Sequence, residues 1–164
     1  MKKLLIYASV LCAISATLII TSRPASASDD NGTLPHVDGN YQFPQTKWSN
    51  VRHTLRIHIP KNSQSVSQIS IIVPKTVRWS NKVNDITVTP NNGQKLNANI
   101  SINEKTIILA FNEPVSSNSK LEINIKNVKQ PLHGNGPIYR LFVKSINSSV
   151  DMPIGMARFR VNSN

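Results

Sequence analysis

Apolar and polar residues alternate along most of the chain after residue 50. In segment 54–59 the apolar residues Leu55, Ile57 and Ile59 fall on one side and the polar residues on the other. A period of two is typical of a β-strand with one buried face. The same pattern predicts further strands at 68–73, 86–89, 98–102, 106–111, 120–128, 138–145 and 156–161. No segment sustains a helical period, so the pattern predicts an all-β protein.

Turn signals separate the predicted strands. Asn92-Gly93 is a strong turn signal because both residues tolerate positive φ. Segment 106–111 is apolar on both faces, which predicts a central strand. Prolines, which lack a ladder donor, stand at strand ends: Pro60, Pro74, Pro90, Pro114, Pro131 and Pro153. About seven to eight short strands predict an antiparallel, immunoglobulin-like β-sandwich, with a closed small barrel as the alternative.

The N-terminus has the pattern of a secretory signal peptide. Lys2 and Lys3 precede an uncharged apolar run at 4–20, and Ala25-Ser26-Ala27 matches the small-x-small cleavage pattern. We therefore expect cleavage before Ser28 and export to the periplasm or out of the cell. A retained N-terminal membrane anchor is the alternative.

The remaining chain divides into an arm and one domain. Residues 1–27 are the expected signal peptide, residues 28–50 are polar with several Gly and Pro and predict a flexible N-terminal arm, and residues 51–164 predict one β-sandwich. The single cysteine, Cys12, lies in the expected signal peptide, so we expect no disulfides. Leu11 before it is too large for the usual lipoprotein cleavage pattern.

The charge favours polyanionic partners. Three of the 19 basic residues precede residue 28, which leaves 16 against eight acidic residues and a net charge of +8. Such a charge attracts acidic polysaccharide or an anionic lipid surface, and nucleic acid is not expected outside the cytoplasm. The alternative is a basic surface that only keeps the protein soluble.

Several basic residues face outward on predicted strands. Arg158 and Arg160 lie on one face of the last strand, opposite Phe159. The candidate polyanion-binding residues are Arg52, Arg56, Lys126, Lys129, Arg158 and Arg160. If the first and last strands are neighbours, Arg56, Arg158 and Arg160 would form a stripe suited to sulfate, phosphate or carboxylate. Solvated faces that discourage edge pairing are the alternative.

The segment 130–142 (QPLHGNGPIYRLF) invites a catalytic interpretation. An oxyanion loop would serve a nucleophile on a Gly-x-Ser-x-Gly elbow, and a phosphate loop would lead into a helix. The chain contains no such elbow, and this segment leads into a predicted strand. We therefore expect a corner in which Gly134 and Gly136 need positive φ or close backbone approach.

Other candidate chemistry is sparse. The four histidines His36, His53, His58 and His133 lack the close spacing of a zinc or copper site, and His53 and His58 would face opposite sides of one strand. No pair of carboxylates stands out for glycosidase chemistry. Trp79 is either core or part of a weak sugar-stacking surface. We expect a non-enzymatic protein without a cofactor, with copper or zinc handling and hydrolase activity as alternatives.

The second half of the chain carries a recognisable order of motifs. A Phe-x-x-Pro-Val segment, a strand, a Pro/Gly corner, a Tyr-x-x-Phe strand and a Gly-x-x-Arg ending follow one another. The residues concerned are Phe111, Pro114, Val115, Pro131, Gly134, Tyr139, Phe142, Gly155 and Arg158. This order resembles an uncharacterised family of small secreted proteins, found mainly in cyanobacteria and catalogued as a domain of unknown function. The likeness covers about residues 50–161 and implies an exported β domain with Pro131, Gly134 and Tyr139 as framework.

Overall fold

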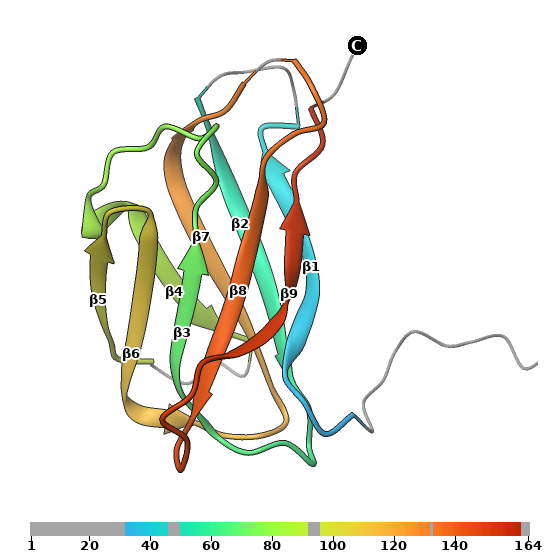
Figure 1. The fold of residues 1–164 in the computed structure, drawn as a ribbon, viewed down its shortest axis with the longest axis vertical. Helices are drawn as coiled ribbons and strands as arrows, with labels where there is room; N and C mark the ends of the chain where they lie inside the picture. Colours follow the sequence, from blue (N-terminus) through green and yellow to red (C-terminus); the bar gives the residue numbers. More distant parts are fainter. Residues whose placement is uncertain (1–31, 46–49, 92–95, 132, 162–164) are drawn as a thin grey trace, which may run out of the picture.

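The computed structural model describes residues 32–45, 50–91, 96–131 and 133–161. Within them, nine strands form two antiparallel sheets packed face to face, with one short 3-10 turn (Figure 1). The elements are β1 (His36–Phe43), β2 (Asn50–Ile59), β3 (Val66–Ile72), η1 (Val83–Asp85), β4 (Ile86–Pro90), β5 (Ala98–Asn103), β6 (Thr106–Val115), β7 (Ser119–Lys129), β8 (Ile138–Ser145) and β9 (Met152–Arg158). The predicted all-β sandwich is confirmed.

The edge strands of the two sheets lie next to each other on both sides of the sandwich. Sheet A has the order β1-β2-β7-β4, and sheet B has the order β5-β6-β3-β8-β9. Strands β1 and β9 are in contact at one side of the sandwich, and β4 and β5 lie at the other side (Figure 1). Strand β6 lies between β5 and β3, so the prediction of a central strand at 106–111 is confirmed.

Strand β1 corrects the prediction of a flexible arm. His36–Phe43 pairs with β2 from His36 opposite His58 to Phe43 opposite Arg52, with a bulge between Val37 and Gly39. Its sequence shows no apolar alternation because two of its partly buried positions, Asn40 and Gln42, are polar and form hydrogen bonds to other parts of the sandwich. The strand count is therefore nine, above the predicted seven to eight. The expected signal peptide lies outside the described residues.

The core contains the residues that alternation places inward. Leu55, Ile57 and Ile59 are fully buried, as are the corresponding positions of β3, β6 and β7. Trp79 packs partly buried against this core. In the last strand, burial alternates through Phe159 although β9 itself spans Met152–Arg158, earlier than the predicted 156–161. No helix in the described part of the chain has the length and apolarity needed to span a membrane.

The His-Gly-Asn-Gly segment forms the corner between β7 and β8. Gly134 and Gly136 have φ of 98° and 75°, as predicted for a corner. The N–H of Phe159 donates to the carbonyl oxygen of Pro137 at 3.0 Å, which brings the end of the chain against the corner. A Cβ atom on Gly136 would overlap the carbonyl oxygen of Phe159. The corner therefore holds the residue that follows β9.

Replacing Gly136 tests this contact. We expect Gly136→Val to lower the free energy of unfolding by about 2–4 kcal/mol, because a branched side chain meets both the positive φ and the Phe159 carbonyl. His133→Ala, in the same exposed corner, should leave it within about 0.5 kcal/mol. Urea unfolding of both variants measures the difference. Equal stability of Gly136→Val and the wild type would contradict the close approach.

Candidate functional site

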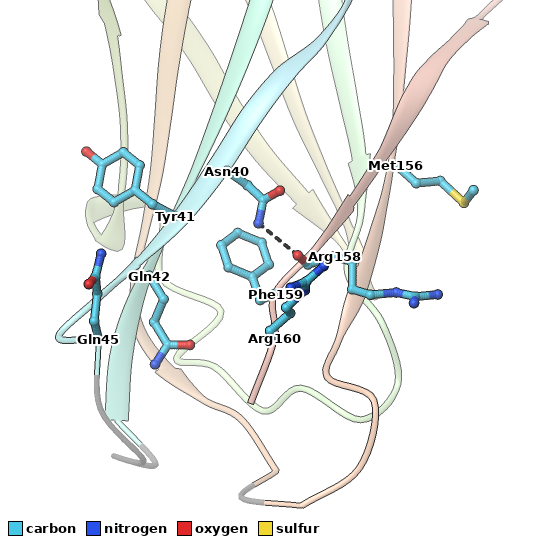
Figure 2. A pocket seen from close by; sticks show the side chains of 8 residues that line it. All are labelled: Asn40, Tyr41, Gln42, Gln45, Met156, Arg158, Phe159 and Arg160. Carbon is cyan, nitrogen blue, oxygen red and sulfur yellow. Dashed lines mark hydrogen bonds between the residues drawn. The ribbon is translucent and has the colours of Figure 1, made fainter. Parts of the chain in front are cut away.

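A groove of about 670 Å³ runs where the edges of the two sheets meet. Strand β1 and the residues after it supply one wall, and the end of β9 supplies the other (Figure 2). The groove is lined by Asn40, Tyr41, Gln42, Gln45, Met156, Arg158, Phe159 and Arg160. The Nδ2 of Asn40 donates to the carbonyl oxygen of Arg158 at 2.9 Å, which joins the two walls directly.

The groove is basic. Arg158 and Arg160 are exposed, while Phe159 between them is buried, so strand alternation sends both guanidinium groups outward. Neither arginine forms an ion pair within the described residues, and none of the groove-lining residues is acidic. Unpaired guanidinium groups keep their donors available, so the groove favours an anionic ligand.

A buried chain of hydrogen bonds, called the relay below, lies behind the groove and consists of Tyr139, His53, Gln130 and Gln42. The Nδ1 of His53 is 2.8 Å from the hydroxyl of Tyr139, and its Nε2 is 2.9 Å from the Oε1 of Gln130. The Nε2 of Gln130 donates to the Oε1 of Gln42 at 2.9 Å, and the Nε2 of Gln42 donates to the carbonyl oxygen of Pro44 at 3.1 Å. This relay connects β8 of sheet B with β2 and β1 of sheet A.

The donor and the acceptor can be assigned at each hydrogen bond of His53. The Oε1 of Gln130 can only accept, so the Nε2 of His53 carries the proton. In the neutral ring the Nδ1 is then an acceptor, and the hydroxyl of Tyr139 donates to it. Burial lowers the pKa of His53 from 6.5 to about 4, although the hydrogen bond to Gln130 opposes part of this shift. Burial also raises the pKa of Tyr139. Both groups are therefore neutral at neutral pH.

The His53 ring supports the groove through Phe159. The two rings are stacked with centroids 3.9 Å apart and an interplanar angle of 8°. Tyr139 packs against the edges of both rings. Phe159 is thereby packed against the core between the two exposed arginines that line the groove. Tyr139 is fully buried, in agreement with its predicted framework role.

The remaining predicted basic residues lie around the same end of the sandwich, with one exception. Lys126 and Lys129 are exposed at the end of β7, and Arg52 near the start of β2 stacks over the ring of Phe43. Arg56 lies further along β2, where its Nε is 2.9 Å from the Oε1 of Glu122. Strand β1 lies between β2 and β9, so Arg56 is not on a strand next to Arg158 and Arg160. Its guanidinium group lies over the ring of Tyr41, a groove residue of β1, 4.9 Å from the ring centroid.

The structure also places the four histidines. His36 and His58 are cross-strand neighbours, with ring centroids 5.1 Å apart. His53 and His58 are both buried, and His133 lies in the exposed corner. The sequence prediction missed the His36–His58 contact because it assigned His36 to the arm. Within the described ranges, no group of three or more His, Cys, Asp or Glu side chains is arranged to hold a metal ion.

The relay residues were not predicted as a site. Tyr139 occupies an inward position of an otherwise apolar strand, and Gln42 belongs to the segment interpreted as an arm. An inward tyrosine and an inward histidine on different strands are the available sequence signal, since buried hydroxyl and imidazole groups need partners. Which strands meet cannot be read from that signal.

Comparison with known proteins identifies the fold and the family. The structure resembles that of BslA, a bacterial hydrophobin, with a TM-score of 0.51 and 18% identity, covering 80% of this chain and 95% of that chain. It also matches a collagen-binding domain from a Staphylococcus aureus adhesin, with a TM-score of 0.42 and 12% identity over 74% of this chain and 96% of that one. A search of curated proteins finds no match. A family model described as a protein of unknown function (DUF2808) matches residues 38–156.

Acid should destabilise the fold through His53. Its pKa is lower in the folded chain than in the unfolded chain, so its stabilising contribution is complete above pH 6.5 and is lost as the pH falls to about 4. Over this window the free energy of unfolding should fall by about 3 kcal/mol more in the wild type than in His53→Gln. Urea unfolding at several pH values measures both slopes, and equal slopes would contradict a buried neutral ring.

Proposed function

The chain belongs to the DUF2808 family of proteins of unknown function, and we propose that it is an exported, non-enzymatic binding protein of the cell envelope or extracellular space. Its ligand is an acidic polysaccharide, which it holds in the groove between β1 and β9. The observation that carries the proposal is the pair of unpaired arginines, Arg158 and Arg160, in a groove whose described lining contains no acid.

The groove chemistry suits a carboxylated or sulfated sugar polymer. A guanidinium group donates two parallel hydrogen bonds to a carboxylate or sulfate, and such charge-assisted bonds are stronger than neutral ones. The opposite wall presents Asn40 and Tyr41, and the phenol hydroxyl of Tyr41 can exchange hydrogen bonds with the hydroxyl groups of sugar rings. An open groove of this kind admits a chain from the side.

Further basic residues extend the surface beyond the groove. Arg52, Lys126 and Lys129 lie at the same end of the sandwich and would meet neighbouring anionic groups of a long polymer. The net charge of +8 after residue 27 attracts polyanions over a longer range. The expected signal peptide supports an extracytoplasmic location, where acidic polysaccharides occur. The polar groove favours a polysaccharide over a lipid surface.

The chemistry of the groove supports binding over catalysis. No carboxylate is among its lining residues, so it offers no general acid for cleaving a glycosidic bond. His53 lies behind Phe159 with both ring nitrogens engaged and its pKa lowered by burial. It therefore does not reach a molecule in the groove as a base. Copper or zinc handling and hydrolysis stay secondary, because no specific observation favours them.

Removing the two arginines tests the groove. We expect Arg158→Ala/Arg160→Ala to weaken binding to polygalacturonate and dextran sulfate about a hundredfold or more, because each of the two lost charge-assisted contacts costs roughly 1.5–3 kcal/mol. Lys61→Ala/Lys82→Ala removes the same charge from exposed positions outside the groove and should have a small effect. Calorimetric titration at two salt concentrations measures both.

Added salt and an uncharged polymer serve as controls for electrostatic binding. Wild-type binding should weaken with added salt, and a neutral glucan should not bind. If both double variants lost the same binding affinity, the polymer would bind to a diffuse basic surface and not specifically to the groove. Salt-insensitive binding would refute the electrostatic proposal. Tight binding to anionic liposomes without polysaccharide binding would move the function to a lipid surface.

A further inference from the structure

The four edge strands differ in how they resist pairing with another strand. Native edges are blunted by charges, prolines, bulges or short length. Strand β1 carries a bulge and the exposed Asp38, and β9 carries a bulge, Pro153 and Arg158. Strand β4 is five residues long and ends at Pro90. Strand β5 has none of these devices, because Ala-Asn-Ile-Ser-Ile-Asn contains no charge and no proline and pairs with β6 without a register shift.

The free edge of β5 presents a row of backbone groups. The N–H of Asn112 on β6 donates to the carbonyl oxygen of Asn97 at 3.2 Å, so the backbone of Asn97 faces β6. Backbone direction alternates along a strand. The N–H and C=O groups of Ala98, Ile100 and Ile102 therefore face away from the sheet, where β5 has no neighbouring strand in the described structure.

The apolar packing on this side of the sandwich is incomplete. Several side chains pack against the core but are only partly buried: Val88, Leu96, Ala98, Ile100 and Ile102. Val83 of η1, which contacts β5, is 42% exposed. Figure 1 shows β4, β5 and η1 together on this side, opposite β1 and β9. A strand added to β5 would cover part of this row.

We propose that β5 pairs antiparallel with β5 of a second copy of this chain, about a two-fold axis. The two copies of sheet B then form one continuous ten-stranded sheet. Residues directly opposite in an antiparallel pair share a face, so Ile100 meets Ile100 or Ile102 of the second copy. Exposed Asn99, Ser101 and Asn103 form the other face of the junction.

Charge selects a second copy of the chain as the occupant. A two-fold axis places identical segments together, so a charged edge would repel itself. The chain after residue 27 has a net charge of +8, whereas the six residues of β5 are all uncharged. Identical neutral strands can approach there while the basic end lies on the opposite side of the sandwich. The β5 pair therefore satisfies the open backbone groups, and the strand residues themselves bring no charged side chains together.

The assembly would have a consequence for binding, which rests on the proposed function. The groove between β1 and β9 is on the side opposite β5, so pairing through β5 leaves both grooves free. A dimer with two grooves would bind one polymer at two places or link two polymers. Linked sites raise the overall affinity for a repeating ligand above that of one groove.

A charge-swap experiment tests the pairing. The full chain is expressed with its own N-terminal segment and purified. Its association is then measured by sedimentation equilibrium at micromolar concentrations, without polysaccharide. The wild type should be a dimer. Ser101→Lys and Ser101→Glu should each weaken the dimer about tenfold, because like charges then meet near the axis. An equimolar mixture of the two variants should restore the wild-type affinity through opposite charges.

Two controls separate this pairing from other causes. Thr89→Lys places the same charge on the exposed face of edge strand β4 and should dimerise as the wild type does. Arg158→Ala/Arg160→Ala should also dimerise normally, so a failure of the groove proposal leaves this measurement intact. A monomeric wild type, a dimer insensitive to both Ser101 variants, or a mixture that stays dissociated would each overturn the β5 pairing.

Discussion

The neutral ring of His53 holds the groove end of the sandwich together. It accepts a hydrogen bond from Tyr139 of sheet B and donates one to Gln130, which in turn bonds to Gln42 of β1. These groups are buried, so each would cost free energy without its partner. Both ring nitrogens are paired in the uncharged ring, and burial keeps the ring uncharged by lowering its pKa. The bond from Gln130 to Gln42 joins this relay to β1, which also pairs with β2 along its length and forms one wall of the groove.

The two sides of the sandwich have different characters. On the β1–β9 side, the buried Phe159 stacks on His53 between two exposed arginines, and the hydrogen bond from Asn40 to the carbonyl oxygen of Arg158 joins the two sheets. On the β4–β5 side, the neutral strand β5 leaves apolar side chains partly open. The two surfaces suit different partners, because the basic groove attracts polyanions and the uncharged edge of β5 can pair with the same strand of a second copy.

Sequence reasoning succeeded where a residue's role depends on its own strand. Leu55, Ile57 and Ile59 were placed inward by alternation alone, and Gly134 and Gly136 have the positive φ expected of a corner. The outward direction of Arg158 and Arg160 was also predictable, since Phe159 between them is apolar. The family match confirms the resemblance to a domain of unknown function. Its predominance among cyanobacteria and its secretion stay predictions.

The sequence by itself determined the strand periods, the all-β class and the Gly/Pro corner, because these depend on burying one face of each strand and on local φ. It left a closed barrel open as the alternative to the sandwich. Only the tertiary structure decided that His36–Phe43 joins sheet A, that β1 separates Arg56 from Arg158, and that His53 meets Tyr139 and Gln130. These relations join residues up to 86 positions apart. Such contacts follow from strand order, and alternation within one strand carries no information about which strand becomes its neighbour.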